Sequence, residues 1–143
     1  MDMQDTELLQ YVHETAEMGI QSLKSLEGRV RDQGLRQALA RQTEEYRDIS
    51  AAAGALLREF GAEPKDPGLM ARVSSEVMST VKSLADPSAS NIAEMVIQGS
   101  TMGITKGTRH LNDYTGNNSQ VRRLAEKLLR TEEANVAQMK QYL

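Results

Sequence analysis

The chain has 143 residues, of which 39% are hydrophobic and 26% are charged, and its net charge is -3. This composition favours one soluble globular domain spanning residues 1–143 over a disordered chain, and the nearly balanced charge gives no reason to expect nucleic-acid binding. The lack of cysteine excludes disulfides and thiolate zinc sites, while the lack of a secretory signal pattern and of a long apolar run favours a cytoplasmic protein without a membrane partner.

Two long amphipathic helices are predicted in the first half of the chain. Apolar or small residues recur every three or four positions from residue 6 to residue 30, which is the period of a helix buried on one side. The pattern resumes at Leu35 and continues to Phe60, after a short reversal bracketed by Gly28 and Gly34. The segment GAEPKDPG then holds two prolines and two glycines, so the second helix must end at Gly61.

A shorter helix is predicted between the second and third long helices. Asp66 can cap it, Pro67 suits its first position, and its apolar stripe extends from Leu69 to Leu84. A segment of this length can carry the chain from one end of a bundle to the other, which would make the second and third long helices parallel. The alternative is a five-helix array in which the short helix caps one end.

Two further long helices complete the predicted fold. Asp86 and Pro87 restart the chain into a third helix that reaches His110, and the turn YTGNNS precedes a fourth helix from about Ser119 to the end. Four long helices and no strand pattern predict an all-α four-helix bundle whose long crossover contains a short extra helix between helices two and three.

A carboxylate interrupts the apolar stripe of the fourth helix. Glu132 falls near the centre of that stripe, and a buried carboxylate must either raise its pKa or find hydrogen-bond donors. We predict a buried polar cluster in which the Tyr46 hydroxyl or the Gln42 amide donates to Glu132; its members are His13, Gln42, Tyr46, Glu132 and Asn135. A partly exposed Glu132 and a degenerate metal or small-ligand site are the alternatives.

Three glycines spaced four residues apart mark the third helix: Gly99, Gly103 and Gly107. Each costs up to about 1 kcal/mol relative to alanine in a helix interior, so a compensating contact is expected. Close packing against the small residues Ala16 and Gly19 of the first helix, a kinked helix and an oligomer groove are three explanations, and the groove is the predicted contact if the protein forms homo-oligomers.

Two short echoes link the two halves of the chain. EMGI at residues 17–20 is echoed by TMGI at 101–104, and RQTEE at 41–45 by LRTEE at 129–133. A duplicated hairpin would explain both echoes. They do not keep the same phase, however, because aligning the apolar stripes pairs Tyr46 with Glu132, so coincidence and distant ancestry both remain open.

The organisation of the chain and one loop resemble a known group of proteins. LLREFGAEPKDPG, followed by a short helix and ADPSASNIAEM, resembles small bacterial ferritin-like proteins of unknown function. The resemblance implies a ferritin-like bundle. It also implies a dinuclear iron or manganese centre, with one Glu from each of two helices and Glu-x-x-His from each of the other two.

The sequence departs from that metal motif. The four candidate pairs place no histidine three residues after a glutamate: Glu44 with Arg47, Glu45 with Asp48, Glu132 with Asn135, and Glu133 with Val136. Of the other candidate ligands, Glu17 lies away from its apolar stripe, and Glu14 and Glu94 are predicted to point toward solvent. We therefore predict a non-catalytic oligomeric scaffold or binding module without a cofactor. The alternative is a metal-binding protein for iron storage or oxidase chemistry, with Glu45 and Glu132 as iron or manganese ligands.

Overall fold

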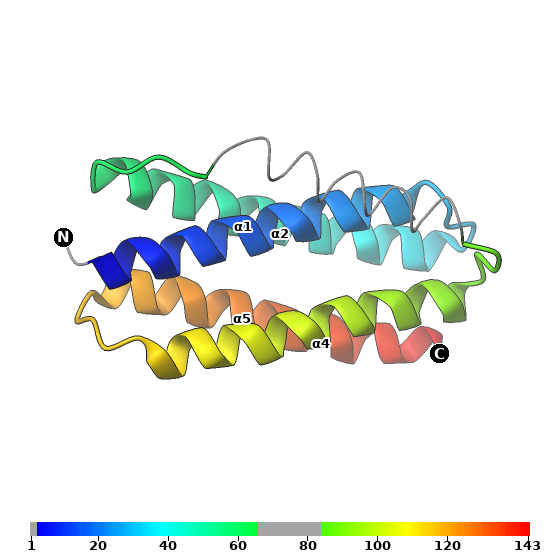
Figure 1. Ribbon diagram of the computed structural model, residues 1–143. Helices are drawn as coiled ribbons and strands as arrows, with labels where there is room; N and C mark the ends of the chain where they lie inside the picture. Colours follow the sequence, from blue (N-terminus) through cyan, green and yellow to red (C-terminus); the bar gives the residue numbers. More distant parts are fainter. Residues whose placement is uncertain (1–2, 66–83) are drawn as a thin grey trace.

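The computed structural model describes residues 3–65 and 84–143. Within these residues the chain forms four long α-helices and a closing 3-10 turn, and no strand: α1 (Met3–Glu27), α2 (Gln33–Glu59), α4 (Ala89–Asp113), α5 (Ser119–Met139) and η1 (Lys140–Tyr142). Figure 1 shows two antiparallel pairs, α1 with α2 and α4 with α5, packed on each other as a bundle. The predicted all-α four-helix fold is confirmed, and none of the described helices is long and apolar enough to cross a membrane.

Capping residues fix where three of the helices begin. The Asp32 side chain accepts a hydrogen bond from the Leu35 amide at 2.8 Å at the start of α2, and Ser88 and Asn118 cap α4 and α5 in the same way. These side chains satisfy backbone N–H groups that a first helical turn leaves free. At the other end of α2, Gly61 adopts φ of 79°, a left-handed conformation that suits glycine and ends the helix where the sequence predicts.

The described residues on either side of 66–83 lie at opposite ends of the bundle. Residues that follow α2 lie beside the first half of α1, because Gln10 Nε2 donates to the Glu63 carbonyl at 2.7 Å. Leu84 lies at the opposite end, where its carbonyl accepts a hydrogen bond from Arg29 Nη2 at 3.2 Å. As a result, α2 and α4 run in the same direction, as the predicted crossover requires (Figure 1). The short helix predicted from Asp66 lies almost wholly outside the described residues.

The core runs along the bundle axis and draws on all four helices. The largest fully buried side chains are Leu9 and Val12 from α1, Leu35, Leu39, Ile49 and Leu57 from α2, Ile92 from α4, and Val121, Leu128 and Met139 from α5. Polar side chains share this interior, among them Gln42, Thr43, Ser100, Glu132 and Asn135. Buried polar groups need hydrogen-bond partners, so these residues form the candidate functional site in the bundle interior.

Candidate functional site: a buried carboxylate in the bundle interior

Glu132 lies inside the bundle near the middle of α5. Its side chain is only 3% exposed, and it shares the inward face of α5 with Leu128 and Asn135. The Tyr46 hydroxyl on α2 donates to Glu132 Oε2 at 3.4 Å, and Asn135 Nδ2 donates to the same hydroxyl oxygen at 3.5 Å. Both hydrogen bonds are long, so the carboxylate is held by weak contacts rather than by a strong donor.

Two glycines make the space that Glu132 and Tyr46 fill. A Cβ atom built on Gly103 of α4 would lie 2.6 Å from the carboxylate carbon of Glu132, and one built on Gly19 of α1 would lie 2.8 Å from the Tyr46 ring. Real side chains do not approach so closely, so α1 and α4 can pass these groups only where they carry glycine. The interior is therefore closely packed: α2 and α5 contribute the large side chains, and α1 and α4 contribute the glycines that accommodate them.

Burial decides the charge state of Glu132. Desolvation by burial raises its pKa to about 7, and the hydrogen bond from Tyr46 opposes this shift without reversing it. No Lys, Arg or His among the described residues forms an ion pair with it. Tyr46 and Tyr11 also have raised pKa values, first because they are buried and then because the Glu132 charge is near. Near neutral pH this carboxyl group can take up or release a proton.

The structure brings together only part of the predicted polar cluster. Tyr46, Glu132 and Asn135 form one group, whereas Gln42 donates to Gln138 Oε1 at 2.9 Å and not to Glu132. The other amide oxygen of that pair, Gln42 Oε1, is buried and has no hydrogen-bond partner among the described residues.

His13 lies elsewhere, on the outer side of the α1 and α2 pair. Its Nε2 is 3.9 Å from Glu17 Oε1, and it lines a surface groove of about 300 Å³ with Ser50 and Arg58. Desolvation by burial lowers the pKa of His13, and the nearby Glu17 carboxylate opposes that shift. The predicted partnership between His13 and Glu132 is therefore absent from the described structure.

The three spaced glycines of α4 have different surroundings. Gly103 and Gly107 are buried, the first against Glu132 and the second near Tyr11 and Leu129, whereas Gly99 is exposed and has nothing within 4 Å of a built Cβ. Contacts inside the described chain thus require glycine at Gly103, whereas a Cβ on Gly107 would make ordinary contacts of 3.6–4.0 Å. A role of this stripe in oligomer contacts stays a prediction.

The candidate metal ligands are dispersed. Glu45 and Glu94 are exposed, and Glu14 lies 3.7 Å from Lys65 Nζ in an ion pair on the outer side of α1. Asn135 occupies the position of the histidine in the Glu132-x-x-Asn135 pair, and among the described residues there is no group of three or more His, Cys, Asp or Glu side chains that could hold a metal ion. The residues in the described interior do not fit a dinuclear carboxylate centre.

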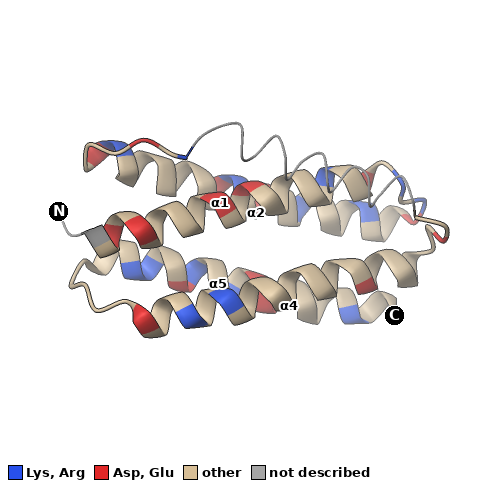
Figure 2. Cartoon of the chain, in the orientation of Figure 1, with Lys and Arg blue, Asp and Glu red and all other residues tan. Residues whose placement is uncertain are grey.

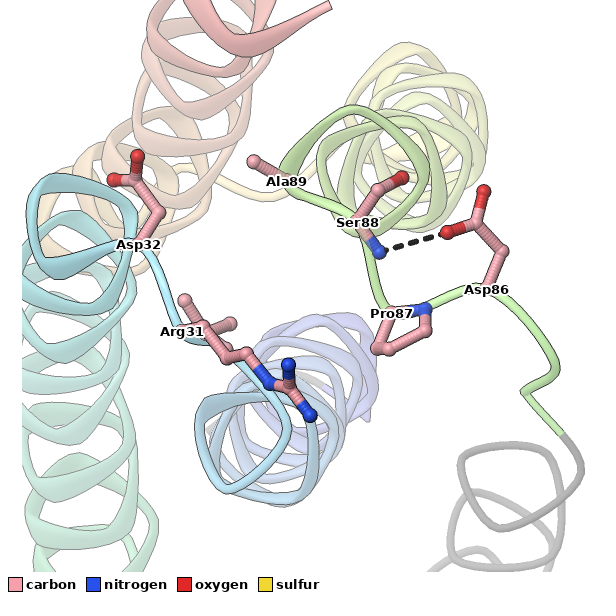
Figure 3. Close-up of a pocket in the computed structure, with 7 residues that line it drawn as sticks. Arg31, Asp32, Asp86, Pro87, Ser88 and Ala89 are labelled. Carbon is pink, nitrogen blue, oxygen red and sulfur yellow. Dashed lines mark hydrogen bonds between the residues drawn. The ribbon is translucent and has the colours of Figure 1, made fainter.

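A second cavity lies at the end of the bundle where α2 and α4 begin. It measures about 270 Å³ and is lined by the α1–α2 connection and the residues before α4, from Val30 to Asp32 and from Asp86 to Ala89 (Figure 3). The acidic and hydroxyl groups there are engaged as caps: Asp32 accepts from Leu35 N, and Asp86 accepts from Ser88 N at 3.0 Å. The polar side chains described in this cavity bind backbone amides near the starts of α2 and α4, so they serve the fold and do not form a catalytic group.

Sequence reasoning underestimated Gly19 and missed Tyr11. The echo of EMGI in TMGI marks the two glycines that face the polar pair, since Gly19 meets Tyr46 and Gly103 meets Glu132. Each contact lies within one helical hairpin, and Tyr46 and Glu132 are the residues paired when the apolar stripes of α2 and α5 are aligned. The echo was therefore the signal that could have identified Gly19 as part of the site.

Comparison with known proteins relates this chain to a solved structure. No protein-family model matches the sequence, and no curated protein matches it. The fold is similar to that of a solved structure described as a dodecameric thioferritin, the bacterioferritin-related protein from Bacteroides fragilis, with a TM-score of 0.74 over 99% of this chain and 86% of that chain at 13% sequence identity. The chain therefore has the ferritin-like four-helix fold.

Proposed function

We propose that this protein is a ferritin-like scaffold or binding module that assembles from several identical copies and operates no dinuclear metal centre. The observation that carries the proposal is the packing of Glu132 against Gly103 and of Tyr46 against Gly19. A ferritin-like metal centre draws carboxylates from all four helices, whereas here α1 and α4 contribute glycines at the polar pair. The space is filled by side chains of this chain.

The similar structure supports the assembly part of the proposal. That protein is described as dodecameric, and closed homo-oligomers are common among soluble proteins. The cytoplasmic location and the absence of a resident cofactor stay predictions.

One observation favours a second candidate, a metal-binding protein. Glu132 is a buried carboxylate without a cationic partner in the described structure, and a bound cation would supply the missing charge. Under this candidate Glu132 and Glu45 would hold iron or manganese for storage or oxidase chemistry. Glu45 is exposed on α2, so the helix would have to rotate or unwind locally to bring both carboxylates to one ion.

Metal titration separates the two candidates. The protein is purified without chelator and titrated anaerobically with Fe(II), and in parallel with Mn(II), by calorimetry. We expect no stoichiometric binding to the wild type, and the same result for Glu132→Ala and for Glu133→Ala, an exposed neighbour that serves as the matched control. Stoichiometric binding that persists in Glu133→Ala and disappears in Glu132→Ala would establish the metal-binding candidate instead.

A further inference from the structure

Two of the exposed large hydrophobic residues in the described chain are methionines, one on α1 and one on α4. Met18 on α1 is 39% exposed and Met102 on α4 is 59% exposed, which leaves Leu143 as the other exposed large hydrophobic residue in the described chain. The two lie at a similar level of the bundle, because the residue after each packs on the buried polar pair. Gly19 packs on the Tyr46 ring, and Gly103 packs on Glu132, which accepts a hydrogen bond from Tyr46. Apolar side chains gathered on a surface mark an interaction site more often than scattered ones do.

Helix geometry places both methionines on one face. Met18 follows Tyr11 by seven residues, two helical turns, and Tyr11 faces α4, where it stacks on His110 at 3.9 Å between ring centroids. Gly99 lies three residues before Met102 and is open to the outside. We call this surface the methionine face; its residues are Glu7 and Met18 of α1 and Gly99, Met102, Lys106 and Arg109 of α4.

Gly99 has no explanation within the described chain. Gly103 leaves room for Glu132 and Gly107 lies near Tyr11, but a Cβ on Gly99 would meet nothing within 4 Å. Glycine in a helix interior costs about 1 kcal/mol relative to alanine, and close approach of another backbone is the usual compensation. The approaching backbone is then expected from outside the described residues, and a second copy of the chain would supply it.

Charges on the methionine face are arranged in a complementary way. Glu7 lies one turn before Tyr11 on α1, and Lys106 and Arg109 flank the Tyr11 contacts on α4, so opposite charges occupy the same end of the two helices (Figure 2). All three are exposed, and none forms an ion pair with another described residue. Asp113 adds one acidic group at the last residue of α4.

We propose that the methionine face binds a second copy of this chain about a two-fold axis parallel to the helices. This inference rests on the proposed oligomeric function and specifies its contact. Such an axis sets α1 of one copy against α4 of the other, so each contact occurs twice. Met18 meets Met102 at the centre, and Glu7 meets Arg109 toward one end.

The arrangement matches the general anatomy of protein interfaces. Methionine is enriched in the buried core of interfaces, where its flexible side chain adapts to the partner, while charged residues lie at the rim. Rim charges of opposite sign select the partner and its orientation. Here they disfavour the arrangement in which α1 meets α1, because Glu7 would then face Glu7.

Light scattering after size-exclusion chromatography tests the apolar contact. Met102→Glu is compared with Leu143→Glu, which places the same charge at the other exposed large hydrophobic residue. We expect Met102→Glu to raise the dissociation constant at least about tenfold, the loss typical of a central interface residue, and Leu143→Glu to leave the mass unchanged. Circular dichroism verifies that both variants remain helical.

Charge reversal tests the orientation. Glu7→Arg and Arg109→Glu should each lower the oligomer mass, and the double variant should recover it. The chain has no cysteine, so a second readout is available: chains carrying Met18→Cys mixed with chains carrying Met102→Cys should form a mixed disulfide dimer. Either variant alone should remain largely uncrosslinked.

The outcomes distinguish this inference from the proposed function. A wild-type protein that is monomeric at every concentration overturns both the oligomeric proposal and the methionine face. An oligomeric wild type whose mass is unchanged by Met102→Glu, or whose mixed cysteine chains fail to crosslink, overturns the face and leaves the oligomeric proposal standing.

Discussion

The middle and one end of the bundle each hold a buried carboxylate that accepts a hydrogen bond from a tyrosine, beside a glycine that leaves space for the pair. In the middle, Tyr46 donates to buried Glu132, and Gly103 leaves the space. At the end where the α4–α5 connection meets α1, Tyr114 donates to buried Asp5. There Gly116 leaves the space, since a Cβ on it would lie 2.6 Å from the Tyr114 hydroxyl oxygen.

The difference lies in what surrounds each carboxylate. Asp5 stands in the first turn of α1, where free backbone N–H groups and the helix dipole favour a negative charge. Its partner Tyr114 is covered by the Arg122 guanidinium, 5.0 Å from the ring centre. Glu132 is surrounded mid-helix by neutral groups, and burial therefore raises its pKa. A carboxylate, a tyrosine and a glycine do not define a function until their electrostatic surroundings are known.

The largest expected effect is the pH dependence of the free energy of unfolding that Glu132 contributes. Its pKa is about 7 in the folded chain and about 4.5 when exposed, so the folded state holds this proton more tightly. The contribution to the free energy of unfolding is fully present below about pH 4.5 and declines as pH rises to about 7, by about 3 kcal/mol in total. Urea unfolding of the wild type and of Glu132→Gln between pH 5 and 8 measures it as the difference between two curves. If the free energies of unfolding of the wild type and of Glu132→Gln change in parallel with pH, Glu132 does not have the raised pKa that its burial implies.

The two tyrosines offer the next comparison. Tyr114→Phe should lower the free energy of unfolding by about 2 kcal/mol and Tyr46→Phe by about 1 kcal/mol, because Tyr114 donates to Asp5 whereas the bond from Tyr46 to Glu132 is long, at 3.4 Å, and therefore weak. Urea unfolding at pH 8 gives both values. A larger loss for Tyr46→Phe would mean that Glu132 depends on its hydroxyl partner more than the geometry indicates.

The smallest expected effect concerns the cation at the end of the bundle. Arg122→Met should lower the free energy of unfolding by about 1 kcal/mol, since it removes the contact with the Tyr114 ring and the hydrogen bond from Nη2 to the Tyr114 carbonyl. Arg123→Met, at an exposed neighbouring position, is the control and should change stability by less than about 0.5 kcal/mol. Equal effects in the two variants would argue against a specific role for Arg122.

Helical periodicity was sufficient to predict most of the fold. The apolar spacing located four helices to within a few residues, and the length of chain after Gly61 predicted the crossover that makes α2 and α4 parallel. The same spacing placed Glu132 inside, where it is found. These predictions succeed because one buried face of a helix leaves a regular trace in a single sequence.

Partners across the bundle were harder to predict. Periodicity gives the direction of a side chain from its own helix but not the height or rotation of the opposing helix. Gln42 therefore meets Gln138 instead of Glu132, and His13 falls at the outer edge of α1 beside Glu17. The contacts of a glycine are harder still to predict, because it has no side chain of its own and its neighbours depend on which side chain of another helix packs against it.

The most direct test of the packed interior is a double-mutant cycle at Gly103 and Glu132. In the wild-type background Gly103→Ala should lower the free energy of unfolding by about 1–3 kcal/mol, because the new methyl group overlaps the Glu132 carboxylate. In the Glu132→Ala background the same change should be neutral or should stabilise the helix by up to about 1 kcal/mol. Equal effects of Gly103→Ala in both backgrounds would show that the carboxylate does not occupy this space and would contradict the account.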